Sequence, residues 1–283
     1  MTVEAHAKVN FTLEVFGKRA DGYHALRSVV MPISLADTLD VEVTDDGLIT
    51  SDTGYDDDLC VKAARVLRQC QDVRRETKDV RLGAAIRVTK RIPAGGGLGG
   101  GSADAAAVLR ALNELWKIGL TREELAEVGA QVGSDVPALV MGGPVVMEGR
   151  GERVEDLRLK TGDLNLVLVN PGVHSSTKEV YADCEARSLD GEDLTAKMVV
   201  ALKSGDLGRI AAALMNDLQP PAVKQHPEIA DALVSLRTAG VVGAMMSGSG
   251  SSVFGLVADE AAAQRISREL NAKGLRAWPV HTI

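Results

Sequence analysis

Pro93-Ala94-Gly95-Gly96-Gly97-Leu98-Gly99-Gly100-Gly101-Ser102 lies between a predicted strand and a predicted helix. Apolar residues alternate over 85–92 before Pro93 ends the pattern, and 102–116 is rich in Ala and Leu at helical spacing. Glycines leave the backbone uncovered, so successive N–H groups can turn toward an anion, and the positive end of the following helix dipole adds to the attraction. The stretch therefore predicts a phosphate-binding loop.

Phosphate-binding loops differ in the residues that follow their glycines. The P-loop requires Lys and then Ser or Thr after its last glycine, and no Lys follows here, so this class is excluded. Gly95, Gly97 and Gly100 have the spacing of the dinucleotide-binding motif, but that motif belongs in a first strand–helix–strand unit and these glycines follow several strands. A dinucleotide-binding protein remains an alternative that saturable NAD binding would revive. A plain surface turn is the interpretation without a ligand.

The loop resembles that of the GHMP kinases (galactose, homoserine, mevalonate and phosphomevalonate kinases), in which Pro, three residues, Gly-Leu and four small residues follow one another. Pro93, Gly97, Leu98 and the run to Ser102 fit in that order. Lys8-Val9-Asn10 resembles the first motif of these kinases, although His6 stands where the motif has proline. Met246–Phe254 resembles the third motif, a glycine turn. With three motifs spread over nearly the whole chain, the protein is identified as a member of this superfamily.

Four other stretches resemble one branch of the superfamily, the 4-diphosphocytidyl-2-C-methyl-D-erythritol kinases of isoprenoid synthesis. They are Gly17–His24, Gly133–Pro137, Pro171–Tyr181 and Asn216–Pro221. The resemblance implies that ATP phosphorylates the 2-hydroxyl of 4-diphosphocytidyl-2-C-methyl-D-erythritol to the 2-phosphate. Asp58 departs from the pattern, because an Asn is expected at this position in the helix on the adenine side.

The resemblance also implies an α+β, two-domain GHMP kinase fold. A ribosomal protein S5 domain 2-like N-terminal domain is expected over 1–160 and a ferredoxin-like C-terminal domain over 161–283. Periodicity predicts strands over 7–15, 29–43 (broken near Pro32 and at Ala36-Asp37), 85–92, 164–169, 244–246, 251–257 and 275–280. It predicts helices over 56–71, 102–116 (with Ser102 and Asp104 at its N-terminus), 121–133, 177–186, 194–203, 207–217, 228–239 and 260–272.

Composition limits the partners. The chain of 283 residues carries 39 acidic and 32 basic residues, a formal net charge of −7, which argues against a general nucleic-acid binder. No apolar run approaches the roughly 20 residues of a membrane span, and the N-terminal residues lack the pattern of a secretory signal. The three cysteines, Cys60, Cys70 and Cys184, form no CxxC pair. We therefore expect a cytoplasmic enzyme with a small-molecule substrate, as a monomer or homodimer.

Asp135 and Lys8 are the predicted catalytic residues. Asp135 precedes a helix marked by Pro137, and a helix N-terminus favours a charged carboxylate. The resemblance implies that Asp135 is the general base for the acceptor hydroxyl and that Lys8 stabilises the developing charge; a plain helix cap is the alternative for Asp135. ATP is expected over the loop residues, namely Pro93, Gly95, Gly96, Gly97, Leu98, Gly99, Gly100, Gly101 and Ser102.

Aromatic residues are rare in this chain, with two Trp, three Tyr and three Phe. Those near motifs are therefore candidates for stacking on cytosine. The predicted substrate-binding residues are Asn10, Tyr23, His24, Tyr181, Gly248 and Gly250. Mg²⁺ is expected with ATP, assisted by Ser102 or Asp104, and the chain contains no dedicated metal-ligand motif. The predicted counter-charges for the two anionic ligands are Lys8, Lys18, Arg19, Lys90 and Lys178.

Two rival functions remain open. A homoserine or mevalonate kinase would share the glycine and lysine motifs, and a requirement for cytidine separates these kinases from the expected activity. A non-catalytic ligand sensor on the same fold would need neither Lys8 nor Asp135, and the presence of both favours an enzyme.

Overall fold

The computed structural model describes residues 1–55, 57–74, 82–159, 164–188 and 190–283. The chain forms two compact units. The first contains Met1–Ala7, Leu35–Ile92 and Gly99–Gly142, and the second contains Lys8–Ser34, Pro93–Leu98 and Gly143–Ile283. These units differ from the two domains expected from the resemblance, 1–160 and 161–283, and that domain division stays a prediction.

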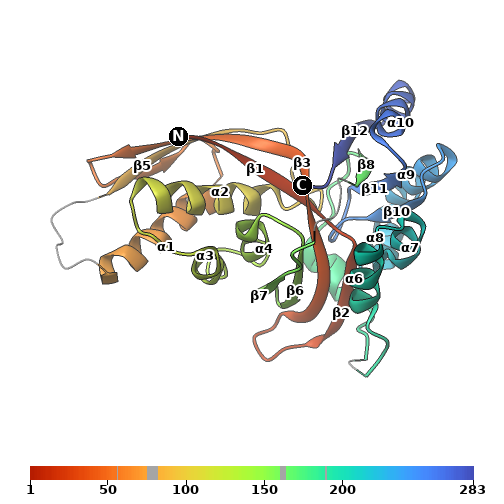
Figure 1. Cartoon of the computed structure of the whole chain (residues 1–283), viewed down its shortest axis with the longest axis horizontal. Coiled ribbons are helices and arrows are strands. Elements are labelled where there is room, and N and C mark those ends of the chain that lie inside the picture. The colour runs from red at the N-terminus through yellow and green to blue at the C-terminus, as the bar shows by residue number, and fades with distance from the viewer. Residues whose placement is uncertain (56, 75–81, 160–163, 189) are drawn as a thin grey trace. The chain divides into compact units, whose positions relative to one another are not determined.

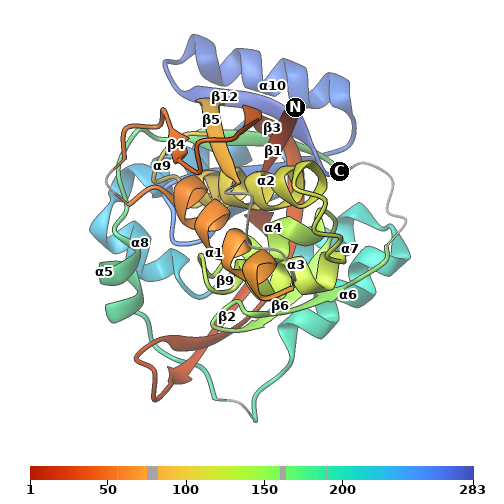
Figure 2. The same cartoon turned by 90° about the vertical axis from the view of Figure 1, so that its left-hand side faces the viewer.

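The first unit combines strands with a layer of helices. Strand β5 (Gly83–Thr89) pairs antiparallel with the end of β3 (His24–Thr44) and parallel with β4 (Ile49–Ser51). Its helices are α1 (Leu59–Arg74), α2 (Gly100–Leu115), α3 (Arg122–Gly129) and α4 (Val136–Met141). The predicted start of α1 at residue 56 lies outside the described residues. Figures 1 and 2 show α1 and α2 side by side, with α3 and α4 close to α2.

Helix α2 is the core of the first unit because its small and apolar side chains bury most of its length. Ala103, Ala105, Ala107, Leu109 and Leu112 are each exposed by at most 1%. The helix begins two residues earlier than predicted. Its N-cap is Gly99 in the left-handed conformation (φ 70°), and no side chain caps it, so Ser102 lies in the first turn without capping it and Asp104 lies further along the helix than predicted.

The capping box of Thr121 and Glu124 is confirmed at the start of α3. The Thr121 side chain accepts from the Glu124 N–H, and the Glu124 carboxylate accepts from the Thr121 N–H over 2.8 Å. The helix ends at Gly129, earlier than the predicted Gly133. A turn then leads to Asp135, the N-cap of α4, whose second helical residue is Pro137.

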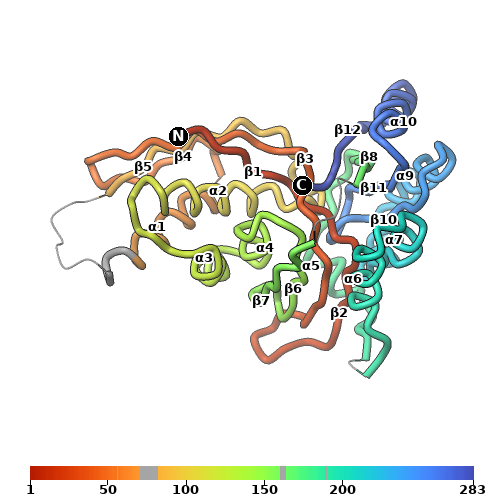
Figure 3. Tube along the Cα trace, in the orientation of Figure 1, coloured from red at the N-terminus to blue at the C-terminus, as the bar shows by residue number. Residues whose placement is uncertain are grey.

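In the second unit, β3 begins a mixed sheet. Residues 26–30 of β3 pair antiparallel with β6 (Val145–Gly149), which pairs with β7 (Arg153–Asp156). Strand β2 (Thr12–Lys18) pairs antiparallel with β3 and parallel with the short β9 (Met215–Asn216). Strand β1 (Thr2–Asn10) precedes β2, so the predicted strand 7–15 is divided at Phe11. Figure 3 traces the β2–β3 hairpin, whose turn contains Asp21 and Gly22.

The predicted breaks in the segment 29–43 are wrong, because β3 runs unbroken over 24–44. Pro32 lies just beyond Val30, the last residue paired with β6, where no ladder bond to that strand requires its missing N–H. Asp37 does not form a turn. It is fully buried, and its carboxylate accepts the backbone N–H groups of Arg91 and Ile92.

The C-terminal part of the second unit is a four-stranded antiparallel sheet in the order β10-β11-β8-β12. Its strands are β8 (Asn165–Asn170), β10 (Gly243–Met246), β11 (Val253–Val257) and β12 (Arg276–His281). Helices α9 (Pro227–Thr238) and α10 (Glu260–Ala272) pack on it (Figure 1). The order strand, helices, two strands, helix, strand is that of a ferredoxin-like fold, as expected.

The segment between β8 and α9 departs from the prediction at two helices. Helix α5 (Thr177–Ala182) is shorter than the predicted 177–186, and α6 (Leu194–Ser204) is close to its prediction. The predicted helix 207–217 ends early as α7 (Leu207–Ala213), and β9 and α8 (Gln219–Gln225) follow. The helix does not continue through Asn216 because Met215 and Asn216 pair with β2 as a short strand.

Candidate active site

The glycine loop packs directly on the glycine turn 247–250 of the second unit. Gly97 adopts the left-handed conformation (φ 73°), and a Cβ there would overlap the Ser247 carbonyl oxygen and lie 3.0 Å from that of Gly250. The Ser247 hydroxyl donates to the Gly97 carbonyl over 3.0 Å. Only a residue without a side chain permits this approach, so the two glycine motifs form one structure.

Neighbouring residues extend this contact. The Ser252 N–H donates to the Gly96 carbonyl over 3.1 Å, and Asn170 at the end of β8 donates to the Ser252 hydroxyl over 3.0 Å. The His174 imidazole lies so close to Gly95 that a Cβ there would overlap it. Sequence reasoning did not single out Asn170, and it gave His174 and Ser252 no role of their own within the stretches Pro171–Tyr181 and Met246–Phe254. A polar Asn ending the apolar strand 164–169 was the available signal for the first of them.

The structural role of the Asn216–Pro221 stretch lies in the hydrogen bonds of the Asn216 side chain. Its amide Nδ2 donates to the carbonyls of Met246 and Gly248, each over 2.8 Å, and its Oδ1 accepts from the Leu218 N–H over 2.9 Å. Its side chain therefore connects the start of α8 to Met246, just before the glycine turn, and to Gly248 within that turn. The Pro171–Tyr181 stretch holds the other half, because the Ser175 hydroxyl donates to the Ser249 carbonyl over 2.7 Å.

Lys8, also in the second unit, lies beside both the glycine loop and the glycine turn. Its backbone N–H donates to the Leu98 carbonyl over 3.0 Å, and a Cβ on Gly248 would lie 3.3 Å from its Nζ. The Nζ donates to Oδ1 of Asn10 over 2.7 Å, and both side chains are buried. Lys8, Asn10, Gly97 and Gly248 are thus brought together. Gly250 is turned toward Met246, whose sulfur would lie 2.8 Å from a Cβ there.

The three rings predicted to bind the substrate, those of Tyr23, His24 and Tyr181, do not form one stack. The rings of His24 and Tyr181 stack with centroids 5.5 Å apart and an interplanar angle of 27°. Tyr23 is 52% exposed and packs instead under the Arg150 guanidinium, 5.4 Å from the ring centroid. A base between two rings needs a separation of roughly 7 Å, twice the contact distance of stacked carbons. A base would therefore stack outside the His24–Tyr181 pair rather than between the two rings.

Asp135 belongs to the first unit and is half-buried. Its side chain makes no capping hydrogen bond to α4, although its carbonyl accepts from the Leu139 N–H over 3.2 Å. The plain-cap interpretation of its carboxylate is therefore not supported. Because Lys8 lies in the second unit, the expected pairing of these two residues stays a prediction.

Lys90 is not an available counter-charge, contrary to the prediction. Its Nζ lies 2.5 Å from the Asp37 carboxylate and 2.6 Å from that of Asp104, so two carboxylates already surround it. Burial raises the pKa of Asp104 to about 6, although the Lys90 ammonium acts in the opposite direction. This cluster fixes Ile92 and the first turns of α2, the two ends of the glycine loop, relative to one another within the first unit.

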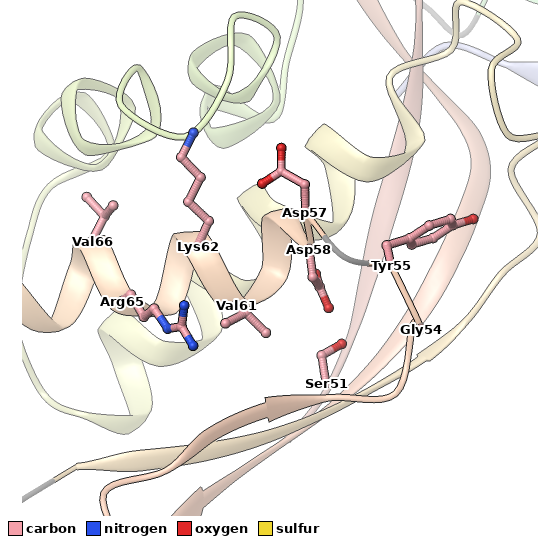
Figure 4. Close-up of a pocket in the computed structure, with 9 residues that line it drawn as sticks. All are labelled: Ser51, Gly54, Tyr55, Asp57, Asp58, Val61, Lys62, Arg65 and Val66. Atoms are coloured by element: carbon pink, nitrogen blue, oxygen red, sulfur yellow. The ribbon is translucent and has the colours of Figure 1, made fainter.

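A cavity of about 370 Å³ lies at the start of α1 (Figure 4). Asp58 caps this helix, since its carboxylate accepts the Cys60 N–H over 2.7 Å and the Thr53 hydroxyl over 2.7 Å. Burial works to raise the pKa of Asp58, but hydrogen bonds from Thr53, Ser51 and the Cys60 N–H outweigh it and hold the pKa below its usual value. The cavity is lined by Ser51, Gly54, Tyr55, Asp57, Asp58, Val61, Lys62, Arg65 and Val66.

Among the residues that the structure describes, no group of three or more His, Cys, Asp and Glu side chains could hold a metal ion. No helix within the same residues is both long and apolar enough to span a bilayer.

The comparisons with known proteins agree with this geometry. The GHMP kinases N terminal domain matches residues 58–143, and the GHMP kinases C terminal domain matches 198–275. A crystal structure of 4-(cytidine 5'-diphospho)-2C-methyl-D-erythritol kinase superimposes with a TM-score of 0.82 at 35% identity, covering 100% of this chain and 99% of the other. Homoserine kinase from Cytophaga hutchinsonii, at 20% identity and a TM-score of 0.77 over 100% and 94% of the chains, shares the fold. Fold and glycine site together define a GHMP kinase.

Curated relatives show to which branch of the GHMP kinases the chain belongs. A 4-diphosphocytidyl-2-C-methyl-D-erythritol kinase from Pelotomaculum thermopropionicum is 43% identical over 94% of this chain and 92% of its own. One from Symbiobacterium thermophilum is 39% identical over 100% of both chains. The chain belongs to the 4-diphosphocytidyl-2-C-methyl-D-erythritol kinase family.

Proposed function

We propose that this chain transfers the γ-phosphoryl group of ATP to the 2-hydroxyl of 4-diphosphocytidyl-2-C-methyl-D-erythritol, giving the 2-phosphate and ADP, a step of the non-mevalonate (MEP) pathway of isoprenoid biosynthesis. The chain is an ATP-dependent kinase that acts on a small-molecule alcohol. The observation that carries the proposal is a sequence identity of 39% to 43%, over nearly the full length, to kinases of this name. The packed glycine loop and glycine turn supply the site where this chemistry would occur.

The glycine loop is the proposed cradle for the phosphates of ATP. Positive φ angles at Gly95, Gly97 and Gly99 turn successive peptide groups, which suits the binding of an anion by backbone N–H groups. The N-terminus of α2 follows immediately, with its first N–H groups unsatisfied by any capping side chain.

Asp135 is the proposed general base. Its carboxylate would accept the proton of the acceptor hydroxyl as that oxygen attacks the γ-phosphorus, while the bond to the β-phosphate oxygen breaks and ADP leaves. Lys8 would stabilise the negative charge on the attacking oxygen and the transferred group. The buried bond to Asn10 and the proximity of Gly248 support this role, because they hold the ammonium beside the glycine turn.

Mg²⁺ is proposed as the partner of ATP, supplying charge neutralisation at the phosphates when it is bound. Mg²⁺ usually keeps several waters and takes one or two protein oxygens in addition to substrate phosphates, so a cluster of three acidic ligands is not required. The donor set fits. Ser102 offers a hydroxyl in the first turn of α2, and Oδ1 of Asp104 is buried without a hydrogen-bond partner. Ser102 and Asp104 would be the protein residues that hold the ion.

The cytidylyl end of the acceptor is proposed to lie at the His24–Tyr181 pair. The rings of His24 and Tyr181 stack on one another, and Tyr23, the residue before His24, packs under the Arg150 guanidinium and offers a second aromatic and cationic group. Gly248 and Gly250 would allow the substrate to approach the turn closely. The three cysteines are free, which agrees with a proposed cytoplasmic location; a monomer or homodimer without nucleic-acid or membrane partners is proposed.

We expect Tyr181→Ala to raise KM for the cytidylyl substrate on the order of 10-fold, because a base stacked on an aromatic ring gains about 1–3 kcal/mol. The KM for ATP should change little. Steady-state kinetics with each substrate varied in turn measure both constants. Tyr55→Ala, at the rim of the α1 cavity, is the matched control and should leave KM for the cytidylyl substrate unchanged. Equal effects on both KM values in Tyr181→Ala would contradict the stacking role.

The function itself is tested by ADP release from purified protein with ATP and Mg²⁺. The acceptors are 4-diphosphocytidyl-2-C-methyl-D-erythritol, homoserine and mevalonate, each alone. Turnover with the cytidylyl substrate alone is the expected result. Turnover only with another alcohol would keep the kinase and reject the substrate. ATP binding without turnover of any acceptor would favour a sensor.

A further inference from the structure

The hydrogen bond from Lys8 to Asn10 is the first of a chain of buried hydrogen bonds that continues to Ser28 and Thr12. Its Nζ donates to Oδ1 of Asn10 over 2.7 Å, and Nδ2 of Asn10 donates to Oγ of Ser28 over 2.8 Å. The Ser28 hydroxyl donates in turn to the Thr12 carbonyl over 2.5 Å. None of these four residues is more than 3% exposed, so water is not a ready substitute partner.

The chemistry of the groups fixes the direction of every bond in this chain. A carbonyl can only accept, so the single proton of Ser28 is committed to Thr12. Ser28 therefore offers Asn10 only a lone pair, and the Asn10 amide must turn its NH₂ group toward Ser28. Its Oδ1 then faces Lys8, whose ammonium can only donate. The orientation of the amide thus follows from the network and not from the placement of indistinguishable atoms.

Without the Ser28 hydroxyl, the amide would lose this constraint. A flipped Asn10 would direct NH₂ at the Lys8 ammonium, so that two donors would face each other, while a retained orientation would leave a buried N–H unpaired. In the first case the ammonium loses its acceptor, and in the second the acceptor belongs to an amide that no hydrogen bond to Ser28 holds in place. Asn10 keeps one further proton on Nδ2 and one lone pair on Oδ1, so the predicted substrate contact of Asn10 remains compatible with this role.

Ser28 is itself firmly placed by its neighbours in the second unit. The Val29 N–H, next in the chain, donates to Oγ1 of Thr12 over 2.8 Å, which ties β3 to β2 beside the network. Oγ1 of Thr12 lies 3.0 Å from Oγ1 of Thr195 in the first turn of α6. The buried Glu14 carboxylate accepts the Thr195 N–H over 3.0 Å. Strands β2 and β3 and helix α6 together hold the Ser28 hydroxyl in place.

We propose that Ser28 is a positioning residue for the reaction, which sets the place of the Lys8 ammonium by fixing the orientation of the Asn10 amide. The Ser28 hydroxyl bonds to Asn10 and to the Thr12 carbonyl, and it acts on the reaction through Lys8. The inference rests on the role of Lys8 in the proposed function.

The test compares substitutions of equal volume at position 28. Ser28→Thr keeps the hydroxyl and Ser28→Val lacks it, so the packing cost of the added methyl is shared and the difference reports the hydroxyl. We expect Ser28→Val and the smaller Ser28→Ala to lower kcat on the order of 10- to 100-fold, as small misplacements of catalytic groups do. Both KM values should stay within a few-fold, and Ser28→Thr should retain most of the wild-type kcat.

Combination with Lys8→Ala separates positioning from general destabilisation. If Ser28 acts through Lys8, adding Ser28→Ala to Lys8→Ala lowers kcat no further. An equal drop in kcat in both backgrounds, or a wild-type kcat in folded Ser28→Ala and Ser28→Val, overturns the proposal for Ser28 alone. A wild-type kcat in Lys8→Ala overturns the catalytic role of Lys8 and the inference with it.

Ser34→Ala is the matched control on the same strand. Its hydroxyl accepts the His281 N–H over 3.1 Å, and among the described residues it takes no part in the hydrogen bonds that hold Lys8. We expect it to leave kcat unchanged. A loss of kcat in Ser34→Ala as large as that in Ser28→Ala would show that any hydroxyl deletion in β3 has this effect, and would overturn the proposal.

Discussion

Asp135→Asn is expected to lower kcat by about 10²- to 10⁴-fold, the usual contribution of a general base. The substitution keeps the shape of the side chain and removes the charge that would accept the hydroxyl proton. Phosphoryl transfer demands mainly positioning and charge stabilisation, so the residual rate reflects the bound and oriented substrates. Nucleotide affinity should stay within a few-fold, because the phosphates are proposed to bind to the loop. Single-turnover kinetics and ATP titration measure the two quantities separately.

A control for this variant is another Asp at a helix N-cap. Asp206 caps α7, accepting the Arg209 N–H over 3.0 Å, and has no proposed part in the reaction. Asp206→Asn should retain the wild-type kcat, since Asn caps helices about as well as Asp. A folded Asp135→Asn enzyme with nearly wild-type turnover would eliminate Asp135 as the base.

The parts of the fold that could be predicted are those with local causes. Apolar alternation, the glycine run and the Ala-rich helix lie next to one another, so neighbouring residues determine the strand, loop and helix over 85–116. The same holds for α10 and for the Thr121–Glu124 capping box. The glycine turn after Met246 was predictable for the same reason, since Ser-Gly-Ser-Gly after a short apolar strand is a turn signal.

The interactions that build the site were not predictable, because they join distant segments. Lys90 looked available for a ligand until Asp37 and Asp104 were placed beside it, from positions 53 and 14 residues away. A break between strands was predicted at Ala36-Asp37, but the buried Asp37 carboxylate accepts two backbone N–H groups from within an unbroken strand. Nothing local distinguishes that Asp from a turn residue.

Asn216 and Ser28 illustrate a signal that sequence reasoning can use. Each is a small polar residue with apolar residues on one side, and each is buried. Buried polar groups are nearly always hydrogen-bonded, so such residues mark a place where another part of the chain must arrive. The partner cannot be read from the sequence, since Asn216 bonds to carbonyls 30 and 32 residues away.

Gly97→Ala is expected to abolish ATP binding at concentrations that saturate the wild-type enzyme. The added Cβ would overlap the Ser247 carbonyl and lie 3.1 Å from the Gly250 nitrogen, and both groups are backbone atoms that cannot rotate away. Ala in the left-handed conformation costs a further 1–2 kcal/mol or so. The loop and the turn must therefore separate, and the backbone N–H groups lose the arrangement that suits the phosphates. Calorimetric titration with ATP measures the loss, and circular dichroism checks that the variant is folded.

A graded series separates close approach from conformational strain. Gly274 also has a positive φ (86°), but a Cβ there meets nothing within 4 Å, so Gly274→Ala should lower stability by about 1 kcal/mol and leave ATP affinity intact. Gly96→Ala should fall between the two, because its Cβ would lie 2.6 Å from the Ser252 hydroxyl, a side chain that can turn aside. Normal ATP affinity in folded Gly97→Ala would place the phosphates away from this loop. Equal losses in Gly97→Ala and Gly274→Ala would trace the effect to strain rather than to the contact with the turn.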